Sequence, residues 1–253
     1  MKIATWNVNS LNVRLPHVLD WLKANPVDIL GLQELKMPDE KFPREAFLDA
    51  GFNAVFAGQK TYNGVAIVSP HKIQNVQTAL PNFDDESKRF IAADVLGARF
   101  VCVYVPNGAD PLSDKFSYKK AWLAAFLEFL KNERAENLVI GGDFNIAPTD
   151  ADVFNAELCE NQICCTAAER AIFKEILAAG FCDTFRLLND APGHFSWWDY
   201  RQGAFHKNHG MRIDFLLTRV ALAAKVKSAT IDKTPRRLPR PSDHTPVIAE
   251  FDF

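Results

Sequence analysis

The sequence lacks the features that would mark it for export, for a membrane or for a cysteine-bound metal. Its longest apolar runs, such as Ala121–Leu130 with Glu128 inside, are too short and too mixed to span a bilayer. The N-terminus carries no apolar segment of the kind found in secretory signals. The five cysteines are an odd number without metal-ligand spacing. We therefore expect reduced thiols in a cytoplasmic protein that has no membrane partner.

Charge is nearly balanced over the whole chain but is unevenly distributed along it. The formal net charge of −2 argues against a generally sticky nucleic-acid binder. Between Arg201 and Arg240, however, the sequence places ten Lys and Arg residues and only two acids, Asp214 and Asp232. On this ground alone two interpretations stay open: a surface that faces a polyanion, or a solvated basic face.

Composition and hydrophobic pattern indicate a globular α/β protein. Hydrophobic residues make up 48% of the chain and charged residues 24%, which is ordinary for a globular domain. No low-complexity tract or linker divides the sequence, so we expect one domain over residues 1–253. No heptads or large exposed apolar stripe indicate assembly, so we expect a monomer.

Strands and helices alternate irregularly along the chain. Strands are predicted at Lys2–Asn7, Val27–Leu32, Phe52–Ala57, Gly64–Ser69, Phe90–Val95, Arg99–Val105, Leu138–Gly141, Arg212–Thr218, Val226–Ile231 and Val247–Phe251. Helical spacing occurs over Leu15–Leu22, after Pro43, over Tyr118–Leu130, and over Ile172–Leu177 behind a capping box at Thr166. Because several strands have no helix between them, two packed sheets with helices outside are favoured.

Polar side chains cluster where the predicted strands end. These residues are Asn7, Asn9, Glu34, Asp143, Asn145, Asp214, Asp243 and His244. Two helix–strand units repeat the pattern, since Val27–Leu32 leads to Glu34 and Leu138–Gly141 leads to Asp143. This weak similarity hints at a duplicated architecture with both acids facing one cleft. An acid within an apolar run, as at Asp214, is costly to bury unless it is paired or metal-bound.

The carboxylates fit metal-assisted phosphoester hydrolysis. Mg²⁺ prefers oxygen ligands and takes only one or two protein carboxylates, leaving room for water and substrate phosphate. Glu34 is the candidate metal ligand, with Asn7 and Asp243 as neighbours. Taken singly, Glu34 is more typical of a surface or capping acid, and the pair Asp243-His244 is as typical of a turn cap as of a site. The coincidence of such residues at strand ends is what favours a site.

The remaining polar residues supply proton transfer and orientation. Asp143 can take a proton from an attacking water, and Asn145 can orient that water or the phosphate. His244, oriented by Asp214, can donate to a phosphate oxygen or help to generate hydroxide. We favour Asp143 as the base, because a histidine paired to Asp214 is expected to be cationic and suited to stabilising phosphate charge.

Five segments together resemble the motif series of the exonuclease III family, within the endonuclease/exonuclease/phosphatase superfamily. They are Trp6–Leu11, Leu32–Lys36, Gly142–Ile146, Arg212–Leu217 and Pro241–Pro246, in the same order and spread over essentially the whole chain. The resemblance implies an α/β four-layer sandwich of two packed mixed sheets flanked by helices. It also implies a Mg²⁺-dependent DNA repair enzyme, with Mn²⁺ as a substitute metal.

The resemblance carries roles to individual positions. Glu34 matches the main metal ligand, with Asn7 and Asp243 close to the metal. The catalytic positions it implies are Tyr104, Asp143, Asn145, Asp214 and His244, where Tyr104 contacts phosphate. The DNA-contacting and pocket positions are Asn107, Trp197, Met211, Ile213, Arg201 and Arg212. Trp197, Met211 and Ile213 would form the walls of a pocket for a flipped-out abasic sugar. For Arg212, a structural role is the alternative to contact with DNA.

Two departures leave the substrate preference open. Asn9 stands where some relatives carry Asp, which removes a charge beside the metal. Residues Leu158–Cys165 match no family pattern, and a bulky residue there would block an abasic sugar while sparing attack at a 3′ end. We expect double-stranded DNA with abasic sites or 3′ ends as the partner. The alternatives are a small-molecule phosphodiesterase or phosphatase of the same superfamily, and a catalytically decayed nucleic-acid-binding regulator.

Overall fold

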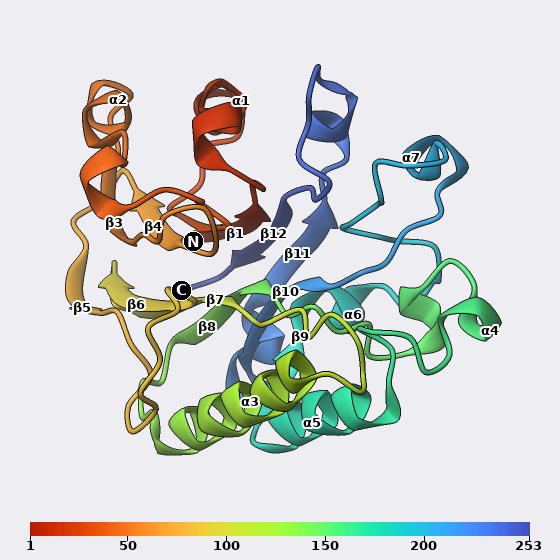
Figure 1. The fold of residues 1–253 in the computed structure, drawn as a ribbon. Coiled ribbons are helices and arrows are strands. Elements are labelled where there is room, and N and C mark those ends of the chain that lie inside the picture. The colour runs from red at the N-terminus through yellow and green to blue at the C-terminus, as the bar shows by residue number, and fades with distance from the viewer.

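Two six-stranded sheets pack face to face at the centre of the computed structural model, which describes residues 1–253. Helices cover the outer face of each sheet, so the layers follow the order helix, sheet, sheet, helix (Figure 1). The expected four-layer α/β sandwich is confirmed. No helix has the length and apolar character needed to cross a membrane.

The first sheet is built from both ends of the chain. Its order is β11 (Val226–Ile231), β12 (Val247–Phe251), β1 (Lys2–Asn7), β2 (Ile29–Gln33), β4 (Val65–Ser69) and β3 (Asn53–Ala57). Only β1 and β2 run parallel; the other neighbours are antiparallel. The connection between β1 and β2 is the helix α1 (Leu11–Ala24).

The second sheet is made by the middle of the chain. Its order is β5 (Gln74–Gln77), β6 (Phe90–Val95), β7 (Ala98–Tyr104), β8 (Leu138–Asp143), β10 (Asp214–Arg219) and β9 (Phe181–Asp183). Here only β7 and β8 are parallel, and the helix α3 (Asp114–Asn132) connects them. The two sheets therefore share one plan, with a parallel strand–helix–strand unit at the centre. This repetition agrees with the duplicated pattern in the sequence and places Glu34 directly after β2 and Asp143 at the end of the equivalent strand β8.

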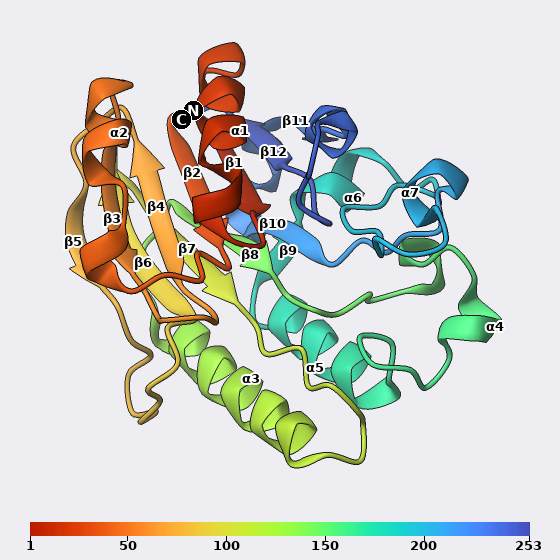
Figure 2. The same cartoon turned by 45° about the horizontal axis from the view of Figure 1, so that its top comes forward.

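The remaining helices are mostly short. They are α2 (Arg44–Asp49), α4 (Ala156–Cys159), α5 (Ala167–Ala178), α6 (Thr184–Leu188) and α7 (Ala204–Lys207), with 3-10 turns at Asp39–Lys41, Asp150–Asp152, Val220–Lys225 and Thr234–Arg237. In the tilted view α3 and α5 lie side by side on one outer face (Figure 2). The capping box predicted at Thr166 is present, because Thr166 and Glu169 exchange side-chain and backbone hydrogen bonds at the start of α5.

An apolar layer between the sheets fixes their separation. Ile29, Ile67, Val139 and Leu216 contribute from the two sheets, and all are buried. Phe100 fills the space over two strand glycines, because a Cβ on Gly31 would lie 2.9 Å and one on Gly141 2.7 Å from its ring. Glycine in a strand is explained here by this close approach rather than by a turn.

Candidate active site

The ends of the central strands meet at one edge of the sandwich, where a cavity of about 380 Å³ opens. It is lined by Glu34, Tyr104, Asn107, Asp143, Asn145, Ile163, Cys164, Trp197, Asp199, Arg201, Met211, Ile213, Asp243 and His244. Eleven of the fourteen expected site residues are among these. Asn7 and Asp214 are fully buried and contact the lining residues from behind, and Arg212 lies elsewhere.

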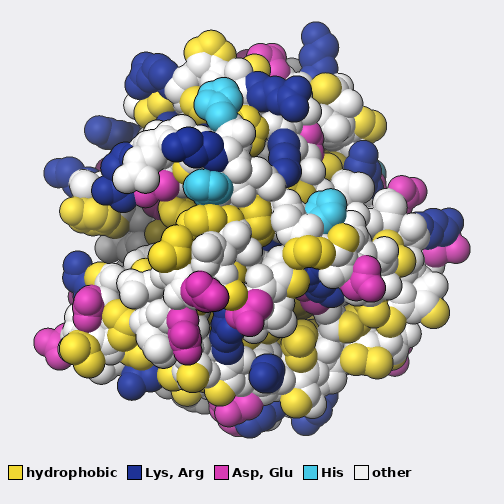
Figure 3. Space-filling model, turned by 90° about the vertical axis from the view of Figure 1, so that its right-hand side faces the viewer, with side chains coloured by type: hydrophobic (Ala, Val, Ile, Leu, Met, Phe, Trp, Pro, Cys, Tyr) yellow, Lys and Arg dark blue, Asp and Glu magenta, His cyan; other side chains and the backbone are white.

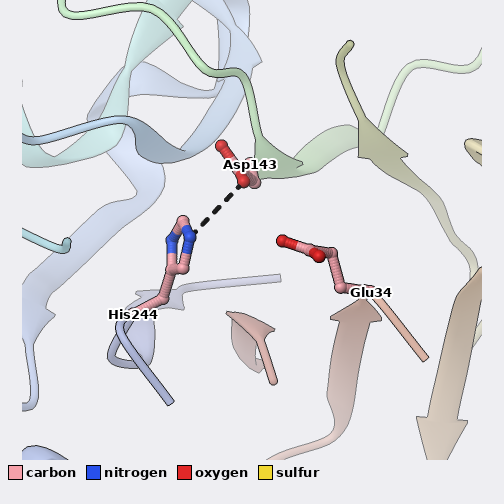
Figure 4. A group of neighbouring side chains, drawn as sticks. All are labelled: Glu34, Asp143 and His244. Atoms are coloured by element: carbon pink, nitrogen blue, oxygen red, sulfur yellow. Dashed lines mark ion pairs between the residues drawn. The ribbon is translucent and has the colours of Figure 1, made fainter. Parts of the chain in front are cut away.

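Three ionisable groups converge in this cavity. One ligand atom each from Glu34, Asp143 and His244 lies within 4.8 Å of the other two (Figure 4). Glu34 follows β2, Asp143 ends β8, and His244 precedes β12, so both sheets contribute. The carboxylate oxygens of such a group can hold a divalent cation. The expected metal neighbour Asp243 lies in the cavity but outside this group of three.

Asn7 ties the two carboxylates together. Its Nδ2 donates to Glu34 Oε1 at 2.8 Å and to Asp143 Oδ2 at 2.9 Å. Its Oδ1 accepts a hydrogen bond from the backbone N–H of Asn9 at 2.9 Å, which fixes which end of the amide faces the acids. Lys36 Nζ lies 2.8 Å from Glu34 Oε2 and holds the other oxygen of that carboxylate. Asn7 therefore lies beside Glu34 as expected, with its amide nitrogen facing both acids.

Asp143 is almost inaccessible to solvent, and its surroundings make its carboxyl group a weaker acid than that of an ordinary Asp. Burial is the largest influence and, with the nearby Asp214 carboxylate, raises the pKa of Asp143 to about 7, although His244, Asn7 and the Asn145 backbone oppose the change. The backbone N–H of Asn145 donates to Asp143 Oδ1 at 2.8 Å. A carboxyl group with a pKa near neutrality is suited to exchange a proton with water during turnover.

His244 is held between two carboxylates. Its Nδ1 lies 2.9 Å from Asp214 Oδ2, and its Nε2 lies 3.7 Å from Asp143 Oδ2. Burial disfavours the imidazolium, but the Asp214 and Asp143 charges outweigh it and raise the pKa of His244 to about 10. The expectation of a cationic histidine agrees with this direction. Nε2 faces the cavity as a donor for an anionic oxygen.

Tyr104 and two asparagines form another wall. Burial, followed by the charges of Glu34 and Asp143, raises the pKa of Tyr104, so its phenol stays protonated and can donate. Asn107 Nδ2 donates to Asn145 Oδ1 at 2.9 Å. Asn145 Nδ2 in turn donates to the carbonyl of Val105 at 3.0 Å and lies 3.3 Å from Asp143 Oδ2. The Asn145 amide is thus engaged by protein groups and orients Asp143.

The residues that precede β12 complete the rim. Asp243 accepts from Asn9 Nδ2 on Oδ1 at 2.8 Å and from Trp197 Nε1 on Oδ2 at 3.0 Å. Burial raises its pKa, but His244 and these two donors outweigh burial, so the pKa of Asp243 lies below its usual value. Asp243 is therefore an anion that positions Trp197 at the cavity mouth.

Comparison with known proteins shows which family has this sequence and fold. The model of the endonuclease/exonuclease/phosphatase family matches residues 4–244. The chain belongs to this family. The resemblance to the exonuclease III group that the sequence motifs predict is confirmed as well. Exodeoxyribonuclease III of Haemophilus influenzae is 34% identical over 99% of this chain and all of its own length, and an exodeoxyribonuclease of Bacillus subtilis is 31% identical over 98% of both chains.

Solved structures of family members superpose over the whole chain. A 3′ phosphatase from Neisseria, bound to a product DNA hairpin, is 48% identical with a TM-score of 0.98. An AP endonuclease from Archaeoglobus fulgidus is 36% identical with a TM-score of 0.97. Both comparisons cover 100% of this chain and of the solved one.

The structure does not support the expectation that Arg212 contacts DNA. Its guanidinium is 2% exposed and is held by Asp152 at 2.7 Å and Asp183 at 2.6 Å. Arg212 is buried, is paired with these two acids and does not line the cavity. It therefore has the structural role that the sequence analysis gave as the alternative to a DNA contact. By contrast, the Arg201 side chain is 83% exposed, is paired with Asp199, and stands at the cavity mouth.

The ten Lys and Arg residues between Arg201 and Arg240 do not all face one surface. Arg219 donates to the carbonyls of Glu133 and Ala135, and buried Arg236 donates to the carbonyl of Ser242. Lys227 pairs with Asp252 beside the C-terminus. The sequence composition cannot distinguish these internal contacts from exposed charges.

Two buried residues that contact the site from behind were missed by the sequence analysis. Ser196 Oγ donates to Asp214 Oδ2 at 2.6 Å and accepts from the backbone N–H groups of Ile213 and Asp214. Lys119 is fully buried, pairs with Glu169, and donates to the carbonyls of Asn145 at 2.7 Å and Asn107 at 3.0 Å. Lys119 did leave a signal, because it occupies the apolar stripe of α3 and is a charge where a hydrophobic residue is expected.

Proposed function

We propose that this protein is a Mg²⁺-dependent DNA repair phosphodiesterase that removes nucleotides and blocking groups from the 3′ ends of duplex DNA. The observation that carries the proposal is the convergence of Glu34, Asp143 and His244 in one cavity. We further propose that residues 1–253 form one catalytic domain, since the apolar layer between the sheets draws on strands from both ends and the middle of the chain.

In this proposal each side chain has a distinct task. Asp143 holds the attacking water and accepts its proton, because its carboxylate is buried and oriented by Asn7 and Asn145. His244 Nε2 and the Tyr104 phenol donate to the phosphate oxygens on which charge develops. Asp214 keeps the imidazole in place through Nδ1. The displacement is a single in-line step without a covalent intermediate.

The donor set suits a hard divalent cation. Glu34 offers carboxylate oxygens at the cavity wall, and Asn7 and Asp243 lie around it as the proposed neighbours. A site with few protein ligands is typical of Mg²⁺, which retains water and substrate phosphate as its other ligands, and Mn²⁺ suits the same oxygens. When bound, the cation would neutralise phosphate charge during hydrolysis.

The pocket walls favour 3′-end processing as the main activity. Trp197, Met211 and Ile213 line one side of the cavity, and Ile163 and Cys164 stand on the other. Cys164 Sγ lies 4.0 Å from Asn145 Oδ1, so this sulfur narrows the space beside the catalytic residues. The 3′ phosphatase activity named for the Neisseria relative supports the same choice. Incision 5′ to abasic sites is the second candidate, supported by the Archaeoglobus relative.

Two labelled duplexes test the proposal. One carries a single internal abasic-site analogue and the other a recessed 3′ end, each incubated with Mg²⁺ or with EDTA. We expect Mg²⁺-dependent shortening of the 3′ end. We also expect Glu34→Ala and Asp143→Asn to lower turnover by about 10²–10⁴-fold without unfolding the protein.

Salt dependence separates DNA from a small phosphoester substrate. Contacts to several DNA phosphates make KM rise steeply with salt, whereas a small substrate is affected much less. Absence of Mg²⁺-dependent cleavage of both duplexes, with intact hydrolysis of a small phosphoester, would contradict the DNA proposal.

A further inference from the structure

A second cavity adjoins the catalytic one and is walled by a pair of stacked rings. Its volume is about 350 Å³, and it shares Trp197, Asp199, Arg201 and Met211 with the catalytic cavity. The rings of Phe154 and His209 are stacked at a centroid distance of 4.7 Å with an interplanar angle of 17°. Nothing in the catalytic arrangement requires this pair.

Backbone pairing holds the stacked rings at a fixed distance from the catalytic histidine. Isolated antiparallel bridges link His244 to Trp197, Trp197 to Met211, and Met211 to Val153, the neighbour of Phe154. The Phe154 backbone N–H also donates to the carbonyl of Gly210 at 3.1 Å. Three strand spacings of about 4.8 Å place the backbone that carries Phe154 roughly 14 Å from the backbone of His244. That separation corresponds to a few nucleotides along a DNA strand.

The position of His209 is fixed from its other side as well. Its backbone N–H donates to the carbonyl of Ala204 in α7 at 2.9 Å. The next residue, Gly210, packs so closely that a Cβ would lie 2.5 Å from Trp198 Nε1. The ring pair is therefore carried by a rigid support. Such preorganisation lowers the entropy lost when a flat ligand binds.

Both rings of the pair are accessible to solvent. Phe154 is 37% exposed although its neighbour Val153 is buried, and His209 is exposed. On the face that carries α4 and α7, hydrophobic, basic and histidine side chains are interleaved in the upper part, and acidic side chains lie below them (Figure 3). The one acid in the cavity lining, Asp199, is neutralised by Arg201 at 2.6 Å. The cavity thus offers a flat apolar wall and no unpaired negative charge.

We propose that this cavity is a subsite for an unpaired base of the DNA strand being processed, which stacks against Phe154 and His209. The inference deepens the proposed function and rests on it. A base is favoured over a phosphate because stacked rings suit a π-face, whereas phosphate is bound through cations and N–H groups. Gln202 and Arg201 stand in the same cavity to meet base edges. The subsite would favour substrates that are single-stranded next to the cleaved phosphate.

Binding to a single-stranded oligonucleotide tests the subsite without turnover. The oligonucleotide carries 2-aminopurine at each of the nucleotides nearest the 3′ end in turn, and the whole protein is kept in EDTA. We expect fluorescence quenching at one position and its loss in Phe154→Leu. Since one stacked base is worth about five- to a hundredfold in affinity, Kd should rise by that factor.

Matched variants separate stacking from damage to the fold. Phe253→Leu changes an aromatic residue at the C-terminus, away from this cavity, and should leave Kd unchanged. His209→Ala alters the exposed partner of the pair and should raise Kd even if Phe154→Leu folds poorly. Both subsite variants should keep the wild-type kcat on a fully paired blunt duplex with Mg²⁺.

Two results would overturn different claims. Wild-type Kd in both Phe154→Leu and His209→Ala, with active wild-type protein, would refute the subsite and leave the nuclease proposal intact. Failure of the wild-type protein to cleave any DNA with Mg²⁺ would instead refute the proposed function on which the subsite depends.

Discussion

The side chain of Asn7 joins Glu34 and Asp143, two acids at the carboxyl ends of equivalent strands in different sheets. One Nδ2 group donates to both carboxylates, at 2.8 and 2.9 Å. The two acids would otherwise repel each other in a buried setting, so a neutral donor between them stabilises the pair. Asn7 also joins the two sheets at the level of the site, which keeps the acids at a fixed separation.

Replacing this donor by an acid should make the site depend on added cation. In Asn7→Asp a third carboxylate would lie between Glu34 and Asp143, and mutual repulsion would lower the melting temperature in EDTA. We expect Mg²⁺ to raise Tm more in this variant than in the wild type, and kcat to fall. Differential scanning fluorimetry with and without Mg²⁺ measures the Tm values, and steady-state cleavage of the duplex with a recessed 3′ end measures kcat. Equal Tm values for variant and wild type in EDTA would show that the amide is not holding the acids together.

Ser196 should matter for turnover through Asp214 rather than by touching substrate. In Ser196→Ala the Asp214 carboxylate loses a donor, and two buried backbone N–H groups lose their acceptor. We expect kcat to fall roughly 10–100-fold, as for partners that orient site ligands, and unfolding free energy to fall by about 1–3 kcal/mol.

The exposed pair of Ser228 and Glu250 provides a matched control for this serine. Ser228→Ala should change neither kcat nor stability. An unchanged kcat in Ser196→Ala would mean that Asp214 and His244 keep their alignment without the hydroxyl.

Asp152 should make stability depend on pH in the acid range. Arg212 and Arg186 bind its carboxylate at 2.7 and 2.6 Å. Burial alone would raise the pKa of Asp152, but these cations outweigh burial and hold it below its usual 3.8. The stabilisation is therefore complete above pH 3.8 and disappears as pH falls through the lower, folded-state pKa.

The variant Asp152→Asn isolates this contribution. Near pH 7 its free energy of unfolding should be about 3–5 kcal/mol lower than that of the wild type, because Arg212 then loses one of its two buried partners. Below pH 3.8 the wild-type and variant curves should converge as the wild-type carboxylate is protonated. Asp150→Asn, which removes an exposed partner of Arg170, should cost less than about 1 kcal/mol at any pH. Urea titrations over this pH range would detect parallel, non-converging curves if the prediction is wrong.

Sequence patterns were enough for the long elements but not for the small ones. Buried strands such as Phe90–Val95 and Val247–Phe251 were predicted with their observed bounds, because their apolar runs end abruptly. The short edge strands β5 and β9 were missed. Gln74–Gln77 has one apolar residue, and Phe181–Asp183 has only three residues, so neither leaves a periodic signal.

The same distinction applies to the candidate site. Residues at the carboxyl ends of strands, including Glu34 and Asp143, could be identified from local pattern and from the family resemblance. Contacts that cross between distant segments could not, because nothing local in the sequence links Ser196 to Asp214 or Arg212 to Asp183. Charge counts failed for the same reason, since they do not separate buried cations from those that face solvent.

Cys164 should control the choice between abasic sites and 3′ ends. It adopts a left-handed backbone with φ of 71°, a conformation that favours glycine, while its buried side chain narrows the cavity beside Asn145. In Cys164→Gly the backbone strain is relieved and the cavity widens. Pocket changes of about one small group alter discrimination roughly 10–200-fold, so incision at an abasic-site analogue should rise by such a factor relative to 3′-end trimming.

A graded series with a distant control makes the prediction specific. Cys164→Ala removes the sulfur but keeps a Cβ, so its ratio of abasic incision to 3′-end trimming should lie between those of the wild type and Cys164→Gly. Cys182→Ala, on β9 and absent from the cavity lining, should leave the ratio unchanged. The ratio is measured as kcat/KM on the two duplexes in parallel. An identical ratio in all four proteins would mean that Leu158–Cys165 does not restrict the abasic sugar, and that the cavity walls around Trp197 set the preference instead.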